Sequence, residues 1–310
     1  AGLGFVNEGL GYDPAVLDLM FEMAWRDEPV AVETWLEQYA HHRYGRANAD
    51  AAGAWQALSS TAYGGPASAR SIIDRMPTLG GGAGHNNPQL AEAWRSLLEA
   101  ADELGGADTY RYDLVNVARQ ALSGHASVLH RQVVKAWQAK DAPAFDLAAQ
   151  RFLDLLQELD ELLATRGEFL LGRCLEDAKR WGTDDAERAR LEWNARRVLT
   201  LWGEGPAIDD YARKEWSGMI AGYYRPRWQR LFGELSACLK ENRPFDEQAF
   251  HAALRPWMAQ WSDGRETYPA VPQGDSVAVA QRLWDKYAED FKPNAVSLTT
   301  GKPATCSHAL

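Results

Sequence analysis

The stretch FLDLLQELDELL, residues 152–163, decides the fold class of this chain. Its large apolar side chains recur at intervals of three and four residues: Phe152, Leu155, Leu156, Leu159, Leu162 and Leu163. Because an α-helix turns once in about 3.6 residues, this spacing places all of them on one broad helix face. An apolar face this wide is typical of a helix packed in the core of a bundle. The stretch therefore predicts a helical bundle.

The same periodicity recurs along most of the chain and predicts an all-α fold with many helices. Gly and Pro interrupt it most between residues 64 and 88, where we expect a surface loop with one short helix at 67–74. Strand-like alternation of more than four residues is confined to the first eight residues, and no repeat of fixed period occurs. The other helices are expected after Asp13 and at residues 32–44, 48–63, 89–104, 112–140, 169–181, 185–201, 209–222, 225–240, 246–261 and 276–287.

Composition excludes several classes of function. The 310 residues carry 33 Lys and Arg against 43 Asp and Glu, a net charge of −10. This balance argues against a nucleic-acid groove or binding to an anionic membrane surface, since both require clustered positive charge. No apolar run approaches the roughly 18 residues needed to span a bilayer. We therefore expect neither nucleic acid nor a membrane as a partner.

The histidines and cysteines have neither the spacing of a metal site nor that of a disulfide framework. His125 and His130 would lie on different faces of a helix, and no H-E-x-x-H motif occurs. The three cysteines are widely spaced without a C-x-x-C pair, which leaves one disulfide as the alternative to free thiols. The stretch RPRW at 225–228 is expected to begin a helix with a stacked or ion-paired arginine. No metal and no cofactor are expected.

One feature points towards sugar binding and another towards catalysis. The chain has 13 Trp, whose rings either fill helix interfaces or stack on the flat faces of sugars. Residues 2–10 form a short apolar strand that ends in Glu8, between Asn7 and Gly9, before a helix follows. Barrel enzymes keep catalytic groups at the C-terminal ends of strands, although a carboxylate there can also be a solvated cap.

Short motifs along the whole chain occur in the order found in one enzyme family. The most specific region, Leu199 to Trp228, contains LTLWG at 199–203, DYA at 210–212 and YYRPRW at 223–228. The others are GLG at 2–4, EG at 8–9, EMAWR at 22–26, RYG at 43–45, AW at 54–55, EAWR at 92–95, RYDL at 111–114, RQA at 119–121 and FLLG at 169–172. Through these motifs the chain, except its tail, resembles the C-terminal part of the α-N-acetylglucosaminidases, glycoside hydrolase family 89.

The resemblance implies a three-part enzyme: a small α/β domain, a (β/α)8 barrel and an all-α C-terminal domain. Residues 1–13 would then be the end of the barrel with the nucleophile loop, residues 14–292 the helical domain and residues 293–310 a disordered tail. The family removes terminal α-linked N-acetylglucosamine with retention of configuration. Glu8 matches its nucleophile, with Asn7 in place of the more usual Pro.

The family's acid/base glutamate lies in an Asn-Glu motif earlier in the barrel, and no residue of this sequence matches it. The chain by itself is therefore expected to be inactive. Its expected partners are the barrel and a glycan that ends in N-acetylglucosamine.

The resemblance also implies that the helical domain lines the pocket. Trp202, Ile208 and Tyr211 match pocket positions, which would supply an indole for the sugar face, an aliphatic group for the N-acetyl methyl and a phenol for a hydrogen bond. The alternative is that these three are core residues at a helix start.

The rim of the pocket is expected to include Tyr63, at the end of the third helix, and the loop at 80–86. His85 and Asn86 in this loop are expected to form hydrogen bonds to the sugar, with a plain exposed loop as the alternative. Many family members carry W-Y-N where this chain has Gly84, His85 and Asn86.

A second interpretation is a non-catalytic helical domain that binds glycans or another protein. The family implies an extracytoplasmic location (secreted, periplasmic or lysosome-like), although residues 1–4 do not begin a signal peptide. The side of the domain that would face the barrel should leave an apolar patch, which would favour a homo-oligomer.

Overall fold

The computed structural model describes residues 4, 14–64, 71–81, 87–203, 205 and 208–292. The end of the barrel expected at 1–13, apart from Gly4, and the tail at 293–310 lie outside the described residues. Within the described part, the chain forms helices and two isolated β-bridges, and it forms no strand. The prediction of an all-α, multi-helix domain is therefore confirmed.

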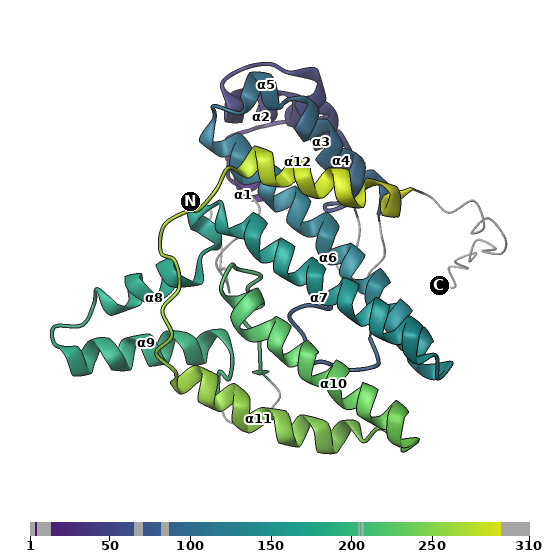
Figure 1. The fold of residues 1–310 in the computed structure, drawn as a ribbon. Helices are drawn as coiled ribbons and strands as arrows, with labels where there is room; N and C mark the ends of the chain where they lie inside the picture. Colours follow the sequence, from purple (N-terminus) through teal and green to yellow (C-terminus); the bar gives the residue numbers. More distant parts are fainter. Residues whose placement is uncertain are drawn as a thin grey trace, which may run out of the picture.

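Two long helices form the centre of the fold (Figure 1). α6 (Asp108–Gln138) and α7 (Ala142–Ala164) pack along each other. A tight turn joins them, with Lys140 at a φ of 56°, and the Asp141 side chain caps α7 by accepting a hydrogen bond from Ala144 N at 3.1 Å. All six apolar residues that predicted α7 are completely buried. The periodicity therefore identified the central helix correctly.

The helices at the two ends of the chain share one core. The helices that precede α6 are α1 (Pro14–Met23), α2 (Val32–Tyr44), α3 (Ala49–Ser60), α4 (Pro88–Glu99) and α5 (Ala101–Leu104). α12 (Ser276–Tyr287) and the 3₁₀ turn η4 (Ala288–Phe291) follow later in the chain, and α12 packs on α4, α6 and α7 (Figure 1). There Trp94 of α4 is completely buried, and its ring lies edge-on to that of Trp284 with 5.3 Å between centroids.

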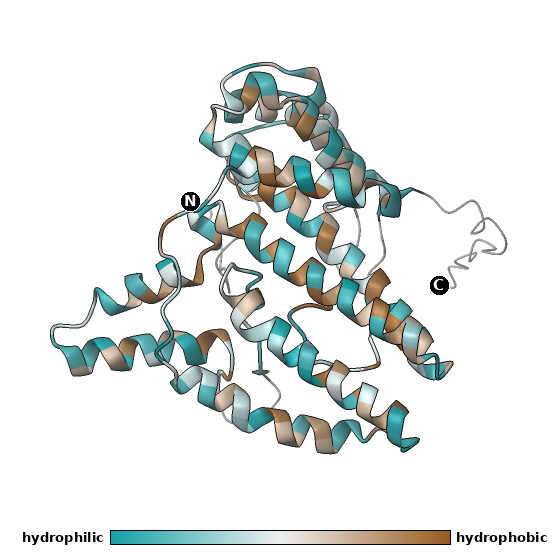
Figure 2. Ribbon diagram, viewed as in Figure 1, coloured by the Kyte–Doolittle hydropathy of each residue, from teal (hydrophilic) through white to brown (hydrophobic). Residues whose placement is uncertain are grey.

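The remaining helices lie between α7 and α12 in the chain. They are η1 (Gly167–Phe169), α8 (Leu171–Lys179), α9 (Asp185–Leu199), the π-helix η3 (Ile220–Tyr224), α10 (Arg225–Glu241) and α11 (Glu247–Asp263). α8 and α9 form a projecting hairpin, α10 packs along α7, and α11 packs on α9 (Figure 1). Figure 2 shows hydrophobic and hydrophilic residues alternating along the helices, as expected when each helix has one buried face.

The prediction of a helix at residues 209–222 is wrong. The chain is irregular from Asp209 to Gly218, and helical structure begins only at Met219. Asp210, Arg213 and Gly218 have φ values of 55°, 49° and 88°, which a right-handed helix excludes. The short helix expected at 67–74 is also not formed at its described residues, because residues 71–74 make a bend and a turn.

Two further expectations from the sequence concern the absence of membrane-spanning helices and the state of the cysteines. None of the helices in the described ranges combines the length and apolar composition that crossing a bilayer requires. Cys174 and Cys238 both carry free thiols, and Cys306 lies outside the described residues. The disulfide that the sequence left open therefore does not join Cys174 to Cys238.

The buried imidazole of His125 on α6 makes the stability of the fold depend on pH. Its Nε2 lies 3.3 Å from Asp290 Oδ2 in η4, yet burial lowers the pKa of His125 to about 4. An unfolded histidine has a pKa of about 6.5, so between these two values the unfolded state binds more protons than the folded state. The contribution of His125 to the free energy of unfolding is therefore complete above the pKa of the unfolded state. It is lost as the pH falls towards the lower pKa of the folded state.

We expect His125→Asn to weaken the pH dependence of stability. The free energy of unfolding in urea, compared near pH 7 and about two units lower, should fall less on acidification in H125N than in the wild type. H41N, which replaces the exposed His41 of α2, serves as the control and should follow the wild type. An H125N curve parallel to the wild-type curve would contradict the assignment.

Candidate functional site

Trp202 and Tyr211 lie together on an exposed surface of the site loop, which we define as residues 200–211 after α9. Their rings meet with 5.6 Å between centroids and 64° between planes. Ile208 belongs to the same loop. The exposed fractions of Trp202, Ile208 and Tyr211 are 43%, 38% and 41%, so none of them is a core residue. The described loop therefore presents aromatic and aliphatic surface to solvent, where a ligand can reach it.

Ile208 lies over the backbone next to Trp202. Gly203, which follows the indole, has a φ of 106°, a backbone conformation that favours glycine. A Cβ at this position would lie 2.7 Å from Ile208 Cδ1, closer than two carbon atoms can approach. Gly203 thus allows Ile208 to pack directly against the start of the loop, beside the indole.

Backbone contacts close the base of the site loop. Leu201 and Asp209 form an antiparallel bridge, and Asp210 N donates a hydrogen bond to Thr200 O at 2.7 Å. The Thr200 hydroxyl also lies 2.9 Å from Ser262 Oγ on α11. The segments that enter and leave the loop therefore form a narrow neck attached to α11.

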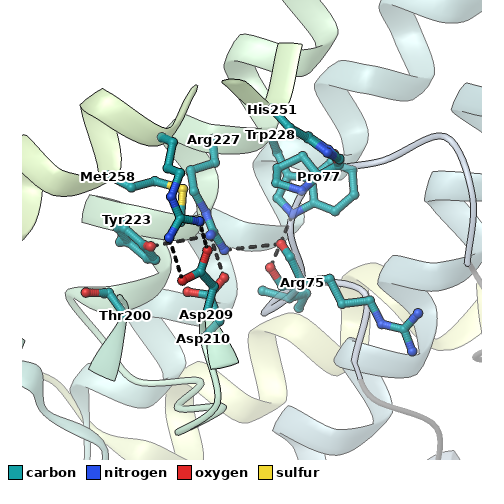
Figure 3. A network of polar contacts seen from close by, with 12 residues as sticks. Arg75, Pro77, Thr200, Asp209, Asp210, Tyr223, Arg227, Trp228, His251 and Met258 are labelled. Carbon is teal, nitrogen blue, oxygen red and sulfur yellow. Dashed lines mark hydrogen bonds and ion pairs between the residues drawn. The ribbon is translucent and has the colours of Figure 1, made fainter. Parts of the chain in front are cut away.

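Asp210 connects this neck to α10 through a fully buried ion pair (Figure 3). Arg227 Nη1 donates to Asp210 Oδ2 at 2.6 Å, and the two side chains are 0% and 1% exposed. The Arg227 guanidinium also lies 4.3 Å from the centre of the Tyr223 ring, and its Nη2 donates to Arg75 O at 3.1 Å. Burial by itself would lower the pKa of Arg227, but Asp210 and the adjacent tyrosines hold it above the ordinary value. The arginine expected to be stacked or ion-paired is therefore both.

Asp209, the neighbouring acid (labelled in Figure 3), pairs with Arg255 of α11. Arg255 Nη1 donates to one carboxylate oxygen, and Nη2 lies 3.4 Å from the other. The Asp209 side chain is 6% exposed and that of Arg255 is 35% exposed. Burial raises the pKa of Asp209, and the hydrogen bond from Arg255 opposes this shift. Two adjacent carboxylates are thus neutralised by arginines from two different helices.

Residues 71–81 are anchored beside these ion pairs by ring nitrogens that contact backbone carbonyls. The contacts are Trp228 Nε1 to Ile73 O at 3.2 Å, His251 Nε2 to Pro77 O at 2.8 Å and His130 Nε2 to Thr78 O at 2.8 Å (Figure 3 labels Trp228, His251 and Pro77). This segment is followed by the loop that holds His85 and Asn86. The anchors come from α6, α10 and α11, and two of these helices, α10 and α11, also hold the site loop.

The other site residues predicted from the sequence are not placed on this surface. Tyr63 lies just beyond the end of α3, where it is half-buried and packs against the hydrophobic core. Glu8, His85 and Asn86 lie outside the described residues. Their proximity to Trp202 stays a prediction.

Sequence reasoning missed the acids that hold the loop. Two consecutive aspartates, Asp209 and Asp210, directly after the apolar Ile208 were a usable signal, because buried carboxylates need a positive partner. The partners themselves could not be chosen from sequence. Arg227 and Arg255 are separated from the acids by 17 and 46 residues.

This arrangement is suited to binding rather than to bond breaking. An exposed indole, a phenol and an aliphatic side chain offer apolar surface and one hydrogen-bonding hydroxyl. Asp209 and Asp210 are occupied by their ion pairs, so neither is poised as a nucleophile or base. Across the ranges that the structure describes, no three His, Cys, Asp or Glu side chains cluster as a metal site would need.

Comparison with known proteins identifies relatives with the same helical domain. The family model described as "Alpha-N-acetylglucosaminidase (NAGLU) C-terminal domain" matches residues 35–286. Human alpha-N-acetylglucosaminidase is 34% identical over 296 residues, which cover 92% of this chain and 40% of the human protein. This chain therefore spans well under half the length of that relative.

Solved structures from Clostridium perfringens share the fold. A family 89 glycoside hydrolase in complex with 2-acetamido-1,2-dideoxynojirmycin matches with a TM-score of 0.80 and 26% identity, over 89% of this chain and 34% of that chain. CpGH89 in complex with its substrate GlcNAc-alpha-1,4-galactose matches with a TM-score of 0.79 and 25% identity, over 90% and 34% of the two chains.

Replacing Asp210 should destabilise the fold strongly. Asp210→Asn leaves the fully buried Arg227 without its counter-charge, and breaking a buried pair in this way typically costs about 3–5 kcal/mol. The matched control is Glu161→Gln, which removes a pair with Arg282 whose side chains are half exposed. E161Q should lower the free energy of unfolding by no more than about 1 kcal/mol. Urea unfolding checks both, and a smaller loss in D210N than in E161Q would contradict the role given to Asp210.

Proposed function

The chain belongs to the family of the alpha-N-acetylglucosaminidase C-terminal domain, and from this premise we propose that it is the nucleophile-bearing part of a retaining exo-glycosidase. The enzyme would hydrolyse terminal α-linked N-acetylglucosamine. The observation that carries the proposal is the exposed pair of Trp202 and Tyr211, with Ile208 beside it, on a loop held by buried ion pairs. The complex of CpGH89 with GlcNAc-alpha-1,4-galactose supports the same substrate class.

In this proposal the site loop binds the sugar at the reacting end of the glycan. The Trp202 indole would stack on the sugar face, because the C–H groups of a pyranose match an aromatic ring. Ile208 would contact the methyl of the N-acetyl group, and the Tyr211 hydroxyl would form a hydrogen bond to a sugar hydroxyl or to the nucleophile. Tyr63 and the loop with His85 and Asn86 would complete the rim.

The reaction would be carried by two carboxyl groups about 5–5.5 Å apart, as retention of configuration requires. The Glu8 carboxylate would attack the anomeric carbon while a glutamate of the barrel protonates the departing glycosidic oxygen. Water, deprotonated by the same barrel residue, would then release the sugar from Glu8. Residues 1–13 would thus belong to the barrel and residues 14–292 to the helical domain that closes the pocket.

A second candidate is a helical glycan-binding domain without catalysis. The observation that favours it is that Asp209 and Asp210, the described carboxylates of the site loop, are both held in ion pairs. This candidate differs from the enzyme in requiring no contribution from Glu8. The two experiments below separate the two candidates.

We expect the 310-residue chain by itself to show no hydrolysis of an aryl α-N-acetylglucosaminide. The acid/base group would be supplied by the barrel, which we propose to precede residue 1 in the full-length protein. The control is the full-length protein, which should release the aryl group under the same conditions. Turnover by the isolated chain would contradict the assignment of the acid/base group to the barrel.

In the full-length protein, Glu8→Gln should lower kcat by about a thousandfold or more, because the amide cannot form the glycosyl-enzyme intermediate. Glu28→Gln, a change of the same type at an exposed position after α1, should keep the wild-type rate. The measurement is steady-state hydrolysis of the aryl glycoside. If E8Q retains the wild-type kcat, Glu8 is not the nucleophile and the non-catalytic candidate gains support.

A further inference from the structure

The contact between Asp209 and Arg255 affects the positions of both Trp202 and Ile208 in the site loop. Asp209 directly follows Ile208, and its bridge partner Leu201 directly precedes Trp202. A displacement of Asp209 would therefore be passed on to Ile208 through the chain and to Trp202 through the bridge. No other side-chain contact described above is placed so that it sets both of these positions.

Helix α11 holds this neck at two points. Arg255 binds Asp209, and Ser262 lies 2.9 Å from the Thr200 hydroxyl. Ser262 lies seven positions after Arg255, which is about two helical turns, so both side chains lie on the same face of α11. Met258, between them on this face, is completely buried. A packed helix face therefore supports the loop from one side.

Arg255 differs from Arg227 in that its side chain is partly exposed to solvent. The Arg255 side chain is 35% exposed, whereas Arg227 is fully buried. Replacing Arg255 lets water reach the contact, so the cost to the fold should be smaller than that of leaving Arg227 unpaired. Arg255 is thus better placed to fix the geometry of the loop than to hold the whole fold together.

We propose that Arg255 is a positioning residue for the sugar pocket: its bidentate contact with Asp209 fixes the neck of the site loop and thereby sets Trp202 against Ile208. This role rests on the proposed function. The indole and the aliphatic side chain would contact the sugar in the ground state and the transition state alike. Losing their placement should therefore weaken substrate binding more than it slows the chemical step.

The test compares Arg255→Met and Arg255→Lys in the full-length protein. R255M should raise KM for the aryl α-N-acetylglucosaminide about tenfold and change kcat by less than about threefold. R255K keeps the charge but loses the bidentate geometry, so its KM should lie between those of R255M and the wild type. The Kd of 2-acetamido-1,2-dideoxynojirmycin, measured by calorimetry, should be lowest in the wild type, higher in R255K and highest in R255M.

The matched control is Arg119→Met, which removes a contact of similar burial between α6 and Glu215. The Arg119 and Glu215 side chains are 25% and 4% exposed, close to the values for Arg255 and Asp209. R119M should lower the free energy of unfolding in urea by about as much as R255M does, and it should leave KM unchanged. If R119M raises KM as much as R255M does, or if R255M keeps the wild-type KM, the positioning role is overturned.

The wild-type measurement separates this role from the function on which it rests. A full-length wild type that does not hydrolyse the glycoside overturns the proposed function, and the positioning role falls with it. A wild type that is active, together with an R255M that has normal KM and Kd, overturns the positioning role alone. Should R255M fail to fold, R255K decides, since a wild-type KM and Kd in that variant would overturn the proposal.

Discussion

The guanidinium of Arg227 joins three segments that lie far apart in the sequence. It pairs with Asp210 of the site loop, donates to the carbonyl of Arg75 and lies against the rings of Tyr223 and Tyr224 in η3, directly before its own helix. Removing an ion from water costs several kcal/mol, so a fully buried arginine is tolerated only when its partners are in place. The site loop, the segment at 71–81 and α10 are therefore assembled together.

This constraint explains how exposed aromatic residues keep a defined position. Trp202, Ile208 and Tyr211 are each about two-fifths exposed, so burial alone does not hold them. Directional contacts below the loop hold its backbone instead, and the aromatic side chains remain available to a ligand. In the proposed enzyme the helical domain would thus supply a preformed binding surface, and the reacting carboxyl groups would come from Glu8 and the barrel.

The helices could be predicted because their signal is local. The apolar stripe of α7 depends only on residues within a few positions of each other. The expected helix at 209–222 failed for the opposite reason. Its residues are compatible with a helix, but Asp209 and Asp210 pair with Arg255 and Arg227 of distant helices. Asp210 also has a left-handed backbone conformation, with a φ of 55°, which interrupts a right-handed helix.

The sequence by itself determined the all-α fold and the enzyme family, since helical periodicity and short motifs are properties of neighbouring residues. It also predicted Trp202, Ile208 and Tyr211 as pocket residues, and that role stays a prediction. It also indicated that an arginine near residue 225 would be stacked or paired. Only the tertiary structure decided which arginine meets which aspartate, and that Trp202 and Tyr211 stand side by side in solvent. The physical reason is that an ion pair between distant residues depends on how whole helices pack, which no local pattern encodes.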